Sequence, residues 1–199
     1  MDTQDKKKDI LKAASSCFAR YGYEKTTLDD IGKLVGLNKA SLYYYYKNKE
    51  SIFSEVIYTE ADEFVKSVFN SIENVPGFKG KILTYLDERH KFIRNAMNLN
   101  QLSVESANKI APIFGVMYQK IMDQEIEHLA GILKGAVRKR QIIECDSQRI
   151  AKSVFTVAEC IRSRVDCQLT SEEAFNEVIR EVDFTVSLIL DGLIRKGED

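Results

Sequence analysis

Residues 26–53 read TTLDDIGKLVGLNKASLYYYYKNKESIF, and this stretch decides how the chain is interpreted. Its first part predicts a short helix, because apolar residues recur there at helical spacing. These residues are Leu28, Ile31, Leu34 and Val35. Thr26 is expected to cap this helix, with Asp29 three residues on in a capping box. Gly36 follows the last apolar residue, where helices commonly end with a positive φ.

A second short helix is expected directly after this turn. Asn38 can cap it, and residues 39–46 allow about two turns. Leu42 and Tyr46 lie four apart on one face, which we assign to the core. The opposite face would present Lys39, Ala40, Tyr43 and Tyr44.

Two short helices around a tight turn indicate a helix-turn-helix, whose second helix enters the major groove of DNA. The alternative is an aromatic core helix. Four consecutive tyrosines cannot all point inward, so the DNA interpretation is favoured. Lysine can reach guanine and the alanine methyl can meet a thymine methyl, so the exposed start of the helix is expected to read bases. The base-reading candidates are Lys39, Ala40 and Tyr44.

Other side chains of the stretch suit the phosphate backbone. Thr27 can offer its hydroxyl and backbone N–H at a helix N-terminus, and Lys49 can offer its ammonium group. Hydroxyl groups can serve in the same way. The phosphate-contact candidates are Thr27, Ser41, Tyr43, Tyr45 and Lys49.

The pattern TT-x3-I-x3-VGL-x3-SLYYYY-K-x-KE resembles the tetracycline-repressor (TetR) family of bacterial transcription regulators. The resemblance covers about the first 55 residues. It implies a homodimer, usually a repressor, which leaves a palindromic operator when a small molecule binds the C-terminal domain. It also implies that the five phosphate-contact candidates face the DNA backbone. Two positions depart from the family, since Gly32 stands where alanine is usual and Tyr45 where histidine is common.

The composition is typical of a globular protein with long helices. The chain has 199 residues, 44% hydrophobic and 30% charged, with 2 prolines and 10 glycines. Its net charge is −1, but residues 1–50 hold 10 Lys and Arg against 7 Asp and Glu. The rest holds 19 against 23, so the end with the helix-turn-helix is mildly basic.

The sequence predicts an all-α fold with two domains. Residues 1–48 would form a three-helix DNA-binding domain, with a first helix from Asp9 to Gly22. Residues 49–199 would form a C-terminal helical bundle for ligand binding and dimerisation, and a helix over 49–74 would belong to both. The further helices are expected at about 78–97, 102–109, 112–140, 146–165 and from Ser171 onward.

The last helix carries an apolar band too broad for one buried face. A helix that is apolar on two sides must bury the second side against something. The last two long helices are therefore expected to pair with their copies in a second subunit, and a central helix in a monomer is the alternative.

Helix bundles hold ligands between their helices, so a small-molecule site is expected in the C-terminal domain. Its aromatic and soft side chains favour a hydrophobic effector, with His90 or His128 as a polar anchor. The candidate lining residues are Phe92, Met97, Phe114, Met117, Tyr118, Met122 and Phe155.

Other classes of function find little support in the sequence. Cys17, Cys145, Cys160 and Cys167 have no zinc spacing, and the chain has only 2 histidines, so neither a metal nor a cofactor is expected. There is no apolar run long enough to span a membrane and no signal peptide, which favours the cytoplasm. No catalytic motif is present, so an enzyme is not expected. An enzyme with an appended helix-turn-helix and a helical protein-interaction module are the alternatives.

Overall fold

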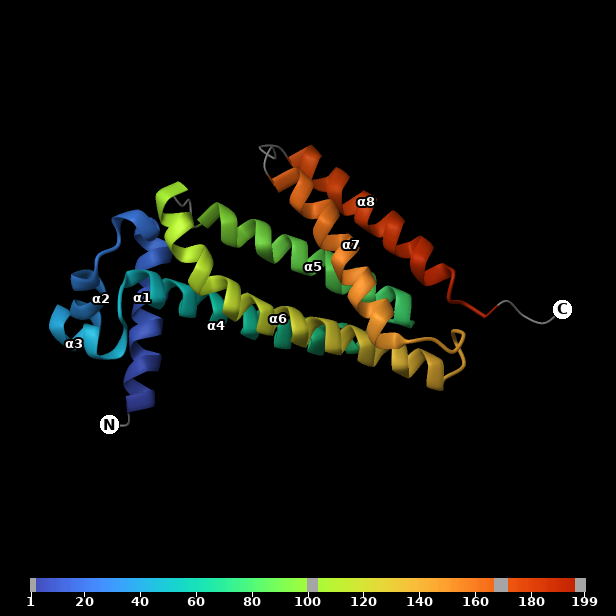
Figure 1. The fold of residues 1–199 in the computed structure, drawn as a ribbon, viewed down its shortest axis with the longest axis horizontal. Helices are drawn as coiled ribbons and strands as arrows, with labels where there is room; N and C mark the ends of the chain where they lie inside the picture. The colour runs from blue at the N-terminus through green and yellow to red at the C-terminus, as the bar shows by residue number, and fades with distance from the viewer. Residues whose placement is uncertain (1–2, 100–103, 167–171, 196–199) are drawn as a thin grey trace. The chain divides into compact units, whose positions relative to one another are not determined.

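The computed structural model describes residues 3–99, 104–166 and 172–195, with the side chains of 95–99, 104, 107 and 163–166 left undescribed. These residues are helical apart from turns, loops and one isolated bridge between Ile142 and Ile194 (Figure 1). The all-α prediction is confirmed. The elements in order are α1 (Thr3–Lys25), α2 (Leu28–Val35), α3 (Lys39–Tyr45), α4 (Lys49–Ser71), the 3₁₀ turn η1 (Ile72–Asn74), α5 (Phe78–Leu99), α6 (Val104–Arg138), α7 (Ser147–Asp166) and α8 (Glu172–Asp191).

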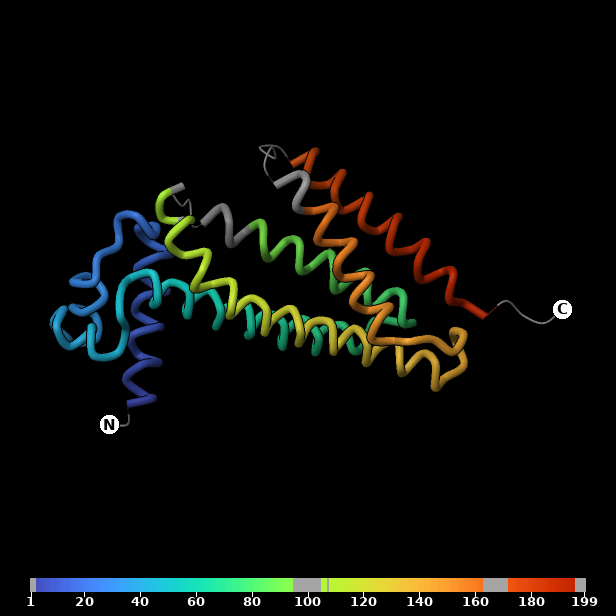
Figure 2. The backbone as a smooth tube through the Cα atoms, viewed as in Figure 1, coloured from blue at the N-terminus to red at the C-terminus, as the bar shows by residue number. Residues whose placement is uncertain are grey.

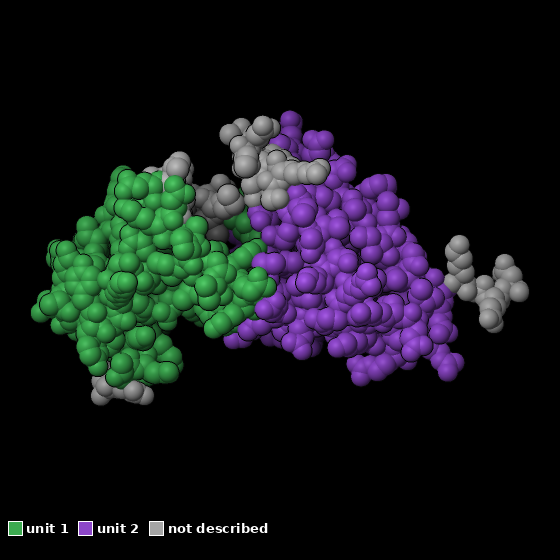
Figure 3. Space-filling view, in the orientation of Figure 1, with its two compact units in different colours: residues 1–64, 93–121 green, residues 65–92, 122–199 purple. Residues whose placement is uncertain are grey.

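The chain divides into two compact units (Figure 3). Unit 1 contains residues 1–64 and 93–121, and unit 2 contains residues 65–92 and 122–199. The helices α4, α5 and α6 each contribute to both. The functional division after residue 48 stays a prediction.

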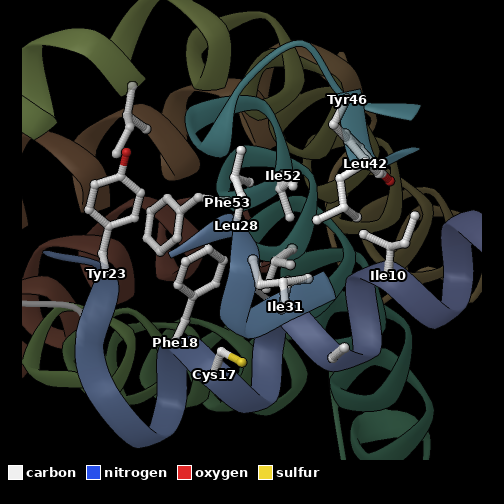
Figure 4. Packing of buried hydrophobic residues seen from close by; sticks show 14 residues of the cluster. Ile10, Cys17, Phe18, Tyr23, Leu28, Ile31, Leu42, Tyr46, Ile52 and Phe53 are labelled. Carbon is white, nitrogen blue, oxygen red and sulfur yellow. The ribbon is translucent and has the colours of Figure 1, made fainter. Parts of the chain in front are cut away.

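Unit 1 is built around one apolar cluster (Figure 4). The rings of Phe18 and Tyr23 from the end of α1 meet Phe53 of α4, with ring centroids 5.0 and 4.7 Å from that of Phe53. Leu42 of α3 is buried in the same cluster. The two short helices thus share a core with α1 and α4, because they cannot bury enough apolar surface by themselves.

α6 also supplies part of this core, which the sequence did not predict. Ile110 is buried in the cluster, and Phe114, one turn later, packs against it. The sequence predicted a new helix at Pro112, but α6 runs through that residue without interruption. A proline inside a helix costs about 3 kcal/mol. Ile110 and Phe114 pack into the core on either side of it, and burial of apolar side chains is favourable.

α1 begins earlier than expected, at Thr3 rather than Asp9. Two contacts hold its first turns in place. The ammonium group of Lys6 donates to the carbonyl of Val35 at 2.9 Å, and that of Lys7 lies 5.3 Å from the centre of the Tyr46 ring. The predicted end at Gly22 corresponds to a non-helical break at that residue, with φ 75°.

Unit 2 is a helical bundle. α7 and α8 run side by side in opposite directions (Figure 2). α8 buries a stripe at four-residue spacing, formed by Val178, Val182, Val186 and Leu190. The backbone N–H of Ile143 donates to the carbonyl of Leu193 at 2.8 Å, which joins the loop after α6 to the end of α8. The expected cap at Ser171 lies outside the described residues.

No helix in the described part of the chain is both long and apolar enough to cross a membrane.

Candidate nucleic-acid interface

α2 begins one residue later than the sequence analysis expected. Thr27, not Thr26, is its N-cap: the Thr27 hydroxyl accepts from the Asp30 backbone N–H at 3.2 Å. The Asp30 carboxylate accepts in turn from the Thr27 backbone N–H at 2.9 Å, which completes a capping box. Thr26 is buried instead, and its hydroxyl donates to the carbonyls of Cys17 and Gly22. Thr26 therefore closes the end of α1.

This capping box bears on the phosphate role predicted for Thr27. Its hydroxyl also donates to the Asp30 carboxylate, at 2.6 Å, so both donors assigned to phosphate are engaged by one acidic group. The same hydrogen bonds hold the pKa of Asp30 below its usual value. A phosphate at this N-terminus would have to displace the Asp30 carboxylate.

The turn between α2 and α3 depends on two glycines. Gly36 adopts the left-handed conformation with φ 67°, which glycine tolerates without strain. The Leu37 backbone N–H donates to the Gly32 carbonyl at 2.9 Å. A Cβ atom on Gly32 would lie 2.4 Å from the Leu37 carbonyl oxygen, so this chain has no room there for the usual alanine of the family.

α3 has the two faces that the sequence predicted. Asn38 caps it, because its side chain accepts from the Ser41 backbone N–H at 2.8 Å. Leu42 and the C-cap Tyr46 are buried, which confirms their assignment to the core.

The other face of α3 points away from the cluster. Lys39 and Ala40 are exposed, and Tyr43 and Tyr44 are 50% and 77% exposed. Tyr45 is half-buried and packs against the core cluster, and its ring meets that of Tyr44 edge-on at 5.0 Å. Ser41 is also half-buried. The candidates nearest to solvent are thus Lys39, Ala40, Tyr43 and Tyr44, and Tyr45 and Ser41 lie at the border of that surface.

The ammonium group of Lys49 is engaged within the protein, whereas its predicted role is to contact a phosphate. Its ammonium group donates to the carbonyls of Tyr23 and Thr26 at 2.9 and 3.0 Å. It also lies 4.1 Å from the centre of the Tyr23 ring. Burial lowers the pKa of Lys49, although Glu24 and Glu50 partly oppose that shift. An ammonium has three N–H donors, so this arrangement leaves at most one for a phosphate.

Lys47 was not singled out from the sequence. It directly follows Tyr46 and is exposed. Lys47 is the first lysine of the K-x-KE element and Lys49 is the second. Their spacing alone did not show which of the two side chains is exposed.

These residues form an outward face of lysine, alanine and tyrosine on a short helix, held by an αL turn against a second short helix. That arrangement defines a DNA-binding helix-turn-helix unit. Proteins with such a unit include transcription regulators. Residues 10–56 match the model of the bacterial regulatory proteins of the tetR family. Residues 10–56 therefore carry the DNA-binding region of this family, and the relatives of the chain include helix-turn-helix transcriptional regulators.

Relatives of known sequence agree with this placement. The HTH-type transcriptional regulator YhgD of Bacillus subtilis is 25% identical over 151 residues, which cover 74% of this chain and 77% of YhgD. IcaR of Staphylococcus epidermidis, the negative transcriptional regulator of the biofilm operon icaADBC, is 37% identical over 90 residues. That match covers 42% of this chain and 49% of IcaR. These relatives are regulators and not enzymes.

Solved structures share the fold over nearly the whole chain. A transcriptional regulator from Cytophaga hutchinsonii superposes with a TM-score of 0.77 at 24% identity, over 94% of this chain and 97% of that one. A TetR-family regulator from Mesorhizobium loti gives a TM-score of 0.68 at 19% identity, over 98% of this chain and 100% of that one.

The effector residues predicted from the sequence do not fall in one unit. Phe92, Met122 and Phe155 belong to unit 2, whereas Phe114, Met117 and Tyr118 belong to unit 1. Phe114 packs against the core of unit 1 and stacks on Tyr118 with centroids 5.5 Å apart. The side chain of Met97 lies outside the described residues. The role of these residues in ligand binding stays a prediction.

Proposed function

We propose that this protein is a homodimeric repressor that binds a palindromic operator and is released from it by a small-molecule effector. The observation that carries the DNA-binding part is the exposure of Lys39, Ala40, Tyr43 and Tyr44 on a helix whose other face is buried. A repressor, rather than an activator, is favoured because IcaR is named a negative regulator. A protein that binds the bacterial chromosome acts in the cytoplasm.

On DNA, the start of α3 would read bases through Lys39, Ala40 and Tyr44. The hydroxyls of Ser41, Tyr43 and Tyr45 would contact phosphates. Lys47 is added to the phosphate set because it is exposed. Thr27 and Lys49 stay in the phosphate set, although their hydrogen-bond donors are engaged within the protein. Thr27 would have to release Asp30, and Lys49 has at most one donor left for a phosphate.

The dimer is supported by the free face of α8. Phe184 and Leu188, one turn apart, are 63% and 58% exposed, although α8 already buries a full stripe within its own subunit. Two large apolar side chains on one face of a helix favour burial against a second copy of α7 and α8.

The release mechanism rests on the spacing between the two recognition helices. A dimer must hold them about 34–36 Å apart to reach successive major grooves. An effector that binds a differently spaced conformer more tightly draws the population toward it, by no more than its differential affinity. A coupling of about 1–3 kcal/mol would weaken DNA binding roughly 5–150-fold.

A mobility-shift assay on the DNA that flanks the protein's own gene tests the proposal. We expect a retarded complex that survives excess nonspecific DNA, and lower affinity for the variants Lys39→Ala and Tyr44→Ala. If the intact protein retards no specific DNA, a protein-interaction module becomes the better interpretation.

A further inference from the structure

Three helices of unit 2 bring charged side chains together out of contact with water. Arg89 and His90 of α5 and Glu125 of α6 are 3%, 2% and 2% exposed. The Arg89 Nε donates to Glu125 Oε1 at 2.6 Å, and the guanidinium of Arg89 also pairs with Glu159 of α7. Such a cluster is unusual in a helical bundle, because burying charge is costly unless every group is matched.

The two arginines and two glutamates that pair in this cluster balance in charge. Arg162 pairs with Glu159 at 3.0 Å, so two arginines face two glutamates. His90 adds no charge near neutral pH, because burial, helped by the Arg89 charge, lowers its pKa to about 4. An added ion of either sign would leave the buried cluster with an unmatched charge.

The hydrogen bonds of the cluster, in contrast, are incomplete. Tyr85 and Arg89 both donate to Glu125 Oε1, while Glu125 Oε2 has no hydrogen-bond partner among the described residues. Both ring nitrogens of His90 are buried and are likewise without a partner in the described part of the chain. Buried polar atoms in native proteins are nearly always hydrogen-bonded to protein, water or ligand. An acceptor on Glu125 and a donor and an acceptor on His90 are therefore open to a bound molecule, as far as the described residues go.

Aromatic surface adjoins these polar groups. The guanidinium of Arg89 lies 4.6 Å from the centre of the Phe155 ring, and Phe69 stacks on Tyr85 with centroids 4.3 Å apart. Met122 lies three residues before Glu125 in α6, so the two residues share a face of that helix, and the half-buried Phe92 belongs to the same helix as His90. Three of the apolar effector candidates, Phe92, Met122 and Phe155, thus belong to the helices of the cluster.

We propose that Glu125 and His90 form the polar end of the effector site, and that the effector is an uncharged molecule with a hydroxyl or amide N–H group on an apolar body. Its N–H or O–H group donates to Glu125 Oε2, and its remaining polar atom hydrogen-bonds to His90. A carboxylate is disfavoured because it would face Glu125 Oε2, and an ammonium because it would add an unmatched charge. This inference rests on the proposed function, since it gives the chemical class of the same effector.

Four probes with one apolar body and different head groups test the inference: 4-butylphenol, butylbenzene, 4-butylbenzoate and 4-butylbenzylammonium. Calorimetric titration of the full-length protein measures their affinities. We expect 4-butylphenol to bind at least ten-fold more tightly than each of the other three. Equal affinity for the phenol and butylbenzene, no binding of the phenol, or preference for either ion would overturn the inference.

The place of binding is tested by NMR of the histidine rings. The chain has 2 histidines, buried His90 and exposed His128, so selective labelling gives one reporter and one reference. The phenol is expected to shift the His90 ring signals more than those of His128. Binding that leaves the His90 signals unchanged contradicts the assignment.

Substitutions separate the polar anchor from the rest of the site. Glu125→Gln and His90→Gln should each reduce the phenol affinity at least ten-fold, to the level of butylbenzene. The matched control is Glu127→Gln at an exposed position of α6, which should bind like the parent. If Glu125→Gln fails to fold, His90→Gln carries the test, and unchanged affinity in that variant overturns the proposal.

The operator assay without probe keeps the two proposals apart. Specific DNA binding together with no head-group preference overturns only the effector class. Head-group preference together with no specific DNA binding overturns the proposed function instead, and with it the role of this site as an effector site.

Discussion

The ammonium nitrogen of Lys49 lies 3.0 Å from the carbonyl oxygen of Thr26, and so joins the first residue of α4 to the segment that leads into α2. A second hydrogen bond, to the carbonyl of Tyr23, fixes the same segment to the end of α1. Lys49 therefore positions the helix-turn-helix against α1 and α4.

Replacement of Lys49 by methionine is expected to destabilise unit 1. The apolar side chain keeps the length of lysine but leaves the Tyr23 and Thr26 carbonyls without their donor, at a cost of about 1–3 kcal/mol. Chemical unfolding measures this loss. Lys47→Met is the matched control, and it should weaken operator binding without changing the free energy of unfolding. If Lys49→Met lowers DNA affinity and leaves stability unchanged, Lys49 acts mainly on phosphate.

The two faces of α3 should separate stability from DNA recognition. Leu42→Ala removes a fully buried side chain and should lower the free energy of unfolding by about 2–5 kcal/mol. Tyr44→Ala changes a side chain that is 77% exposed, so operator affinity should fall while stability stays within about 0.5 kcal/mol. Thermal unfolding and fluorescence anisotropy with labelled operator DNA measure the two quantities. A large loss of stability for Tyr44→Ala would show that its ring is needed in the core.

Gly32→Ala should destabilise the protein, although alanine is the better helix former by about 1 kcal/mol. The new Cβ would lie 2.4 Å from the Leu37 carbonyl oxygen, which is backbone and cannot rotate away. Gly115→Ala in α6 is the control, because a Cβ there meets nothing within 4 Å, and it should stabilise the protein. Denaturant titration compares the two variants. A gain in stability from Gly32→Ala would mean that the turn after α2 relaxes freely.

The apolar face of α8 should control the oligomeric state. Replacing Phe184 and Leu188 together by serine is expected to shift a dimer toward monomer without unfolding it, because both side chains are exposed within their own subunit. Sedimentation at low concentration measures the shift. Ile143→Ser, at an exposed apolar residue outside α7 and α8, should leave the dimer intact. Monomers of the parent protein at every concentration would contradict the proposed interface.

His90 should make the protein less stable in mild acid. Its folded pKa of about 4 lies below the usual 6.5, so the unfolded state binds the proton more readily. The stabilisation by neutral His90 is complete above pH 6.5 and is lost as the pH falls toward 4. At pH 5 the loss is about 1–3 kcal/mol relative to pH 7.5.

The pH dependence of His90→Gln separates this effect from other titrating groups. Arg89, Arg162, Glu159 and Asp87 affect the pKa of His90, so their charges contribute to its pH dependence. The variant should show a flatter profile of unfolding free energy between pH 4 and 6.5 than the parent. Identical profiles would show that His90 is not the group responsible.

The local pattern was sufficient to predict the helix-turn-helix and much less informative about what surrounds it. The periodicity of Leu42 and Tyr46 predicted the buried face of α3, because a two-turn helix has only one way to face a core. The cap of α2 was misplaced by one residue, since Thr26 and Thr27 offer the same chemistry and only burial separates them. The burial of Ile110 in the core of unit 1 depends on a contact between residues far apart in the sequence, which periodicity does not encode.

The cluster around Arg89 could not be predicted from the sequence either. His90 was considered as a polar anchor, but the neighbouring Arg89 pairs with Glu125 and Glu159, which are 36 and 70 positions away from it in the chain. A glutamate in an amphipathic helix is usually exposed, so neither residue attracts notice without the fold.

The presence of Ile110 in the core of unit 1 limits how the chain can be shortened. A fragment ending after α4 would keep every residue of the DNA-facing surface but would lack the α6 segment that covers part of its interior. Such a fragment would expose apolar surface of the core cluster that Ile110 and Phe114 contact, and would tend to aggregate. An isolated reader domain of this protein would therefore need α6 residues supplied in the same polypeptide, for example through a short linker after α4.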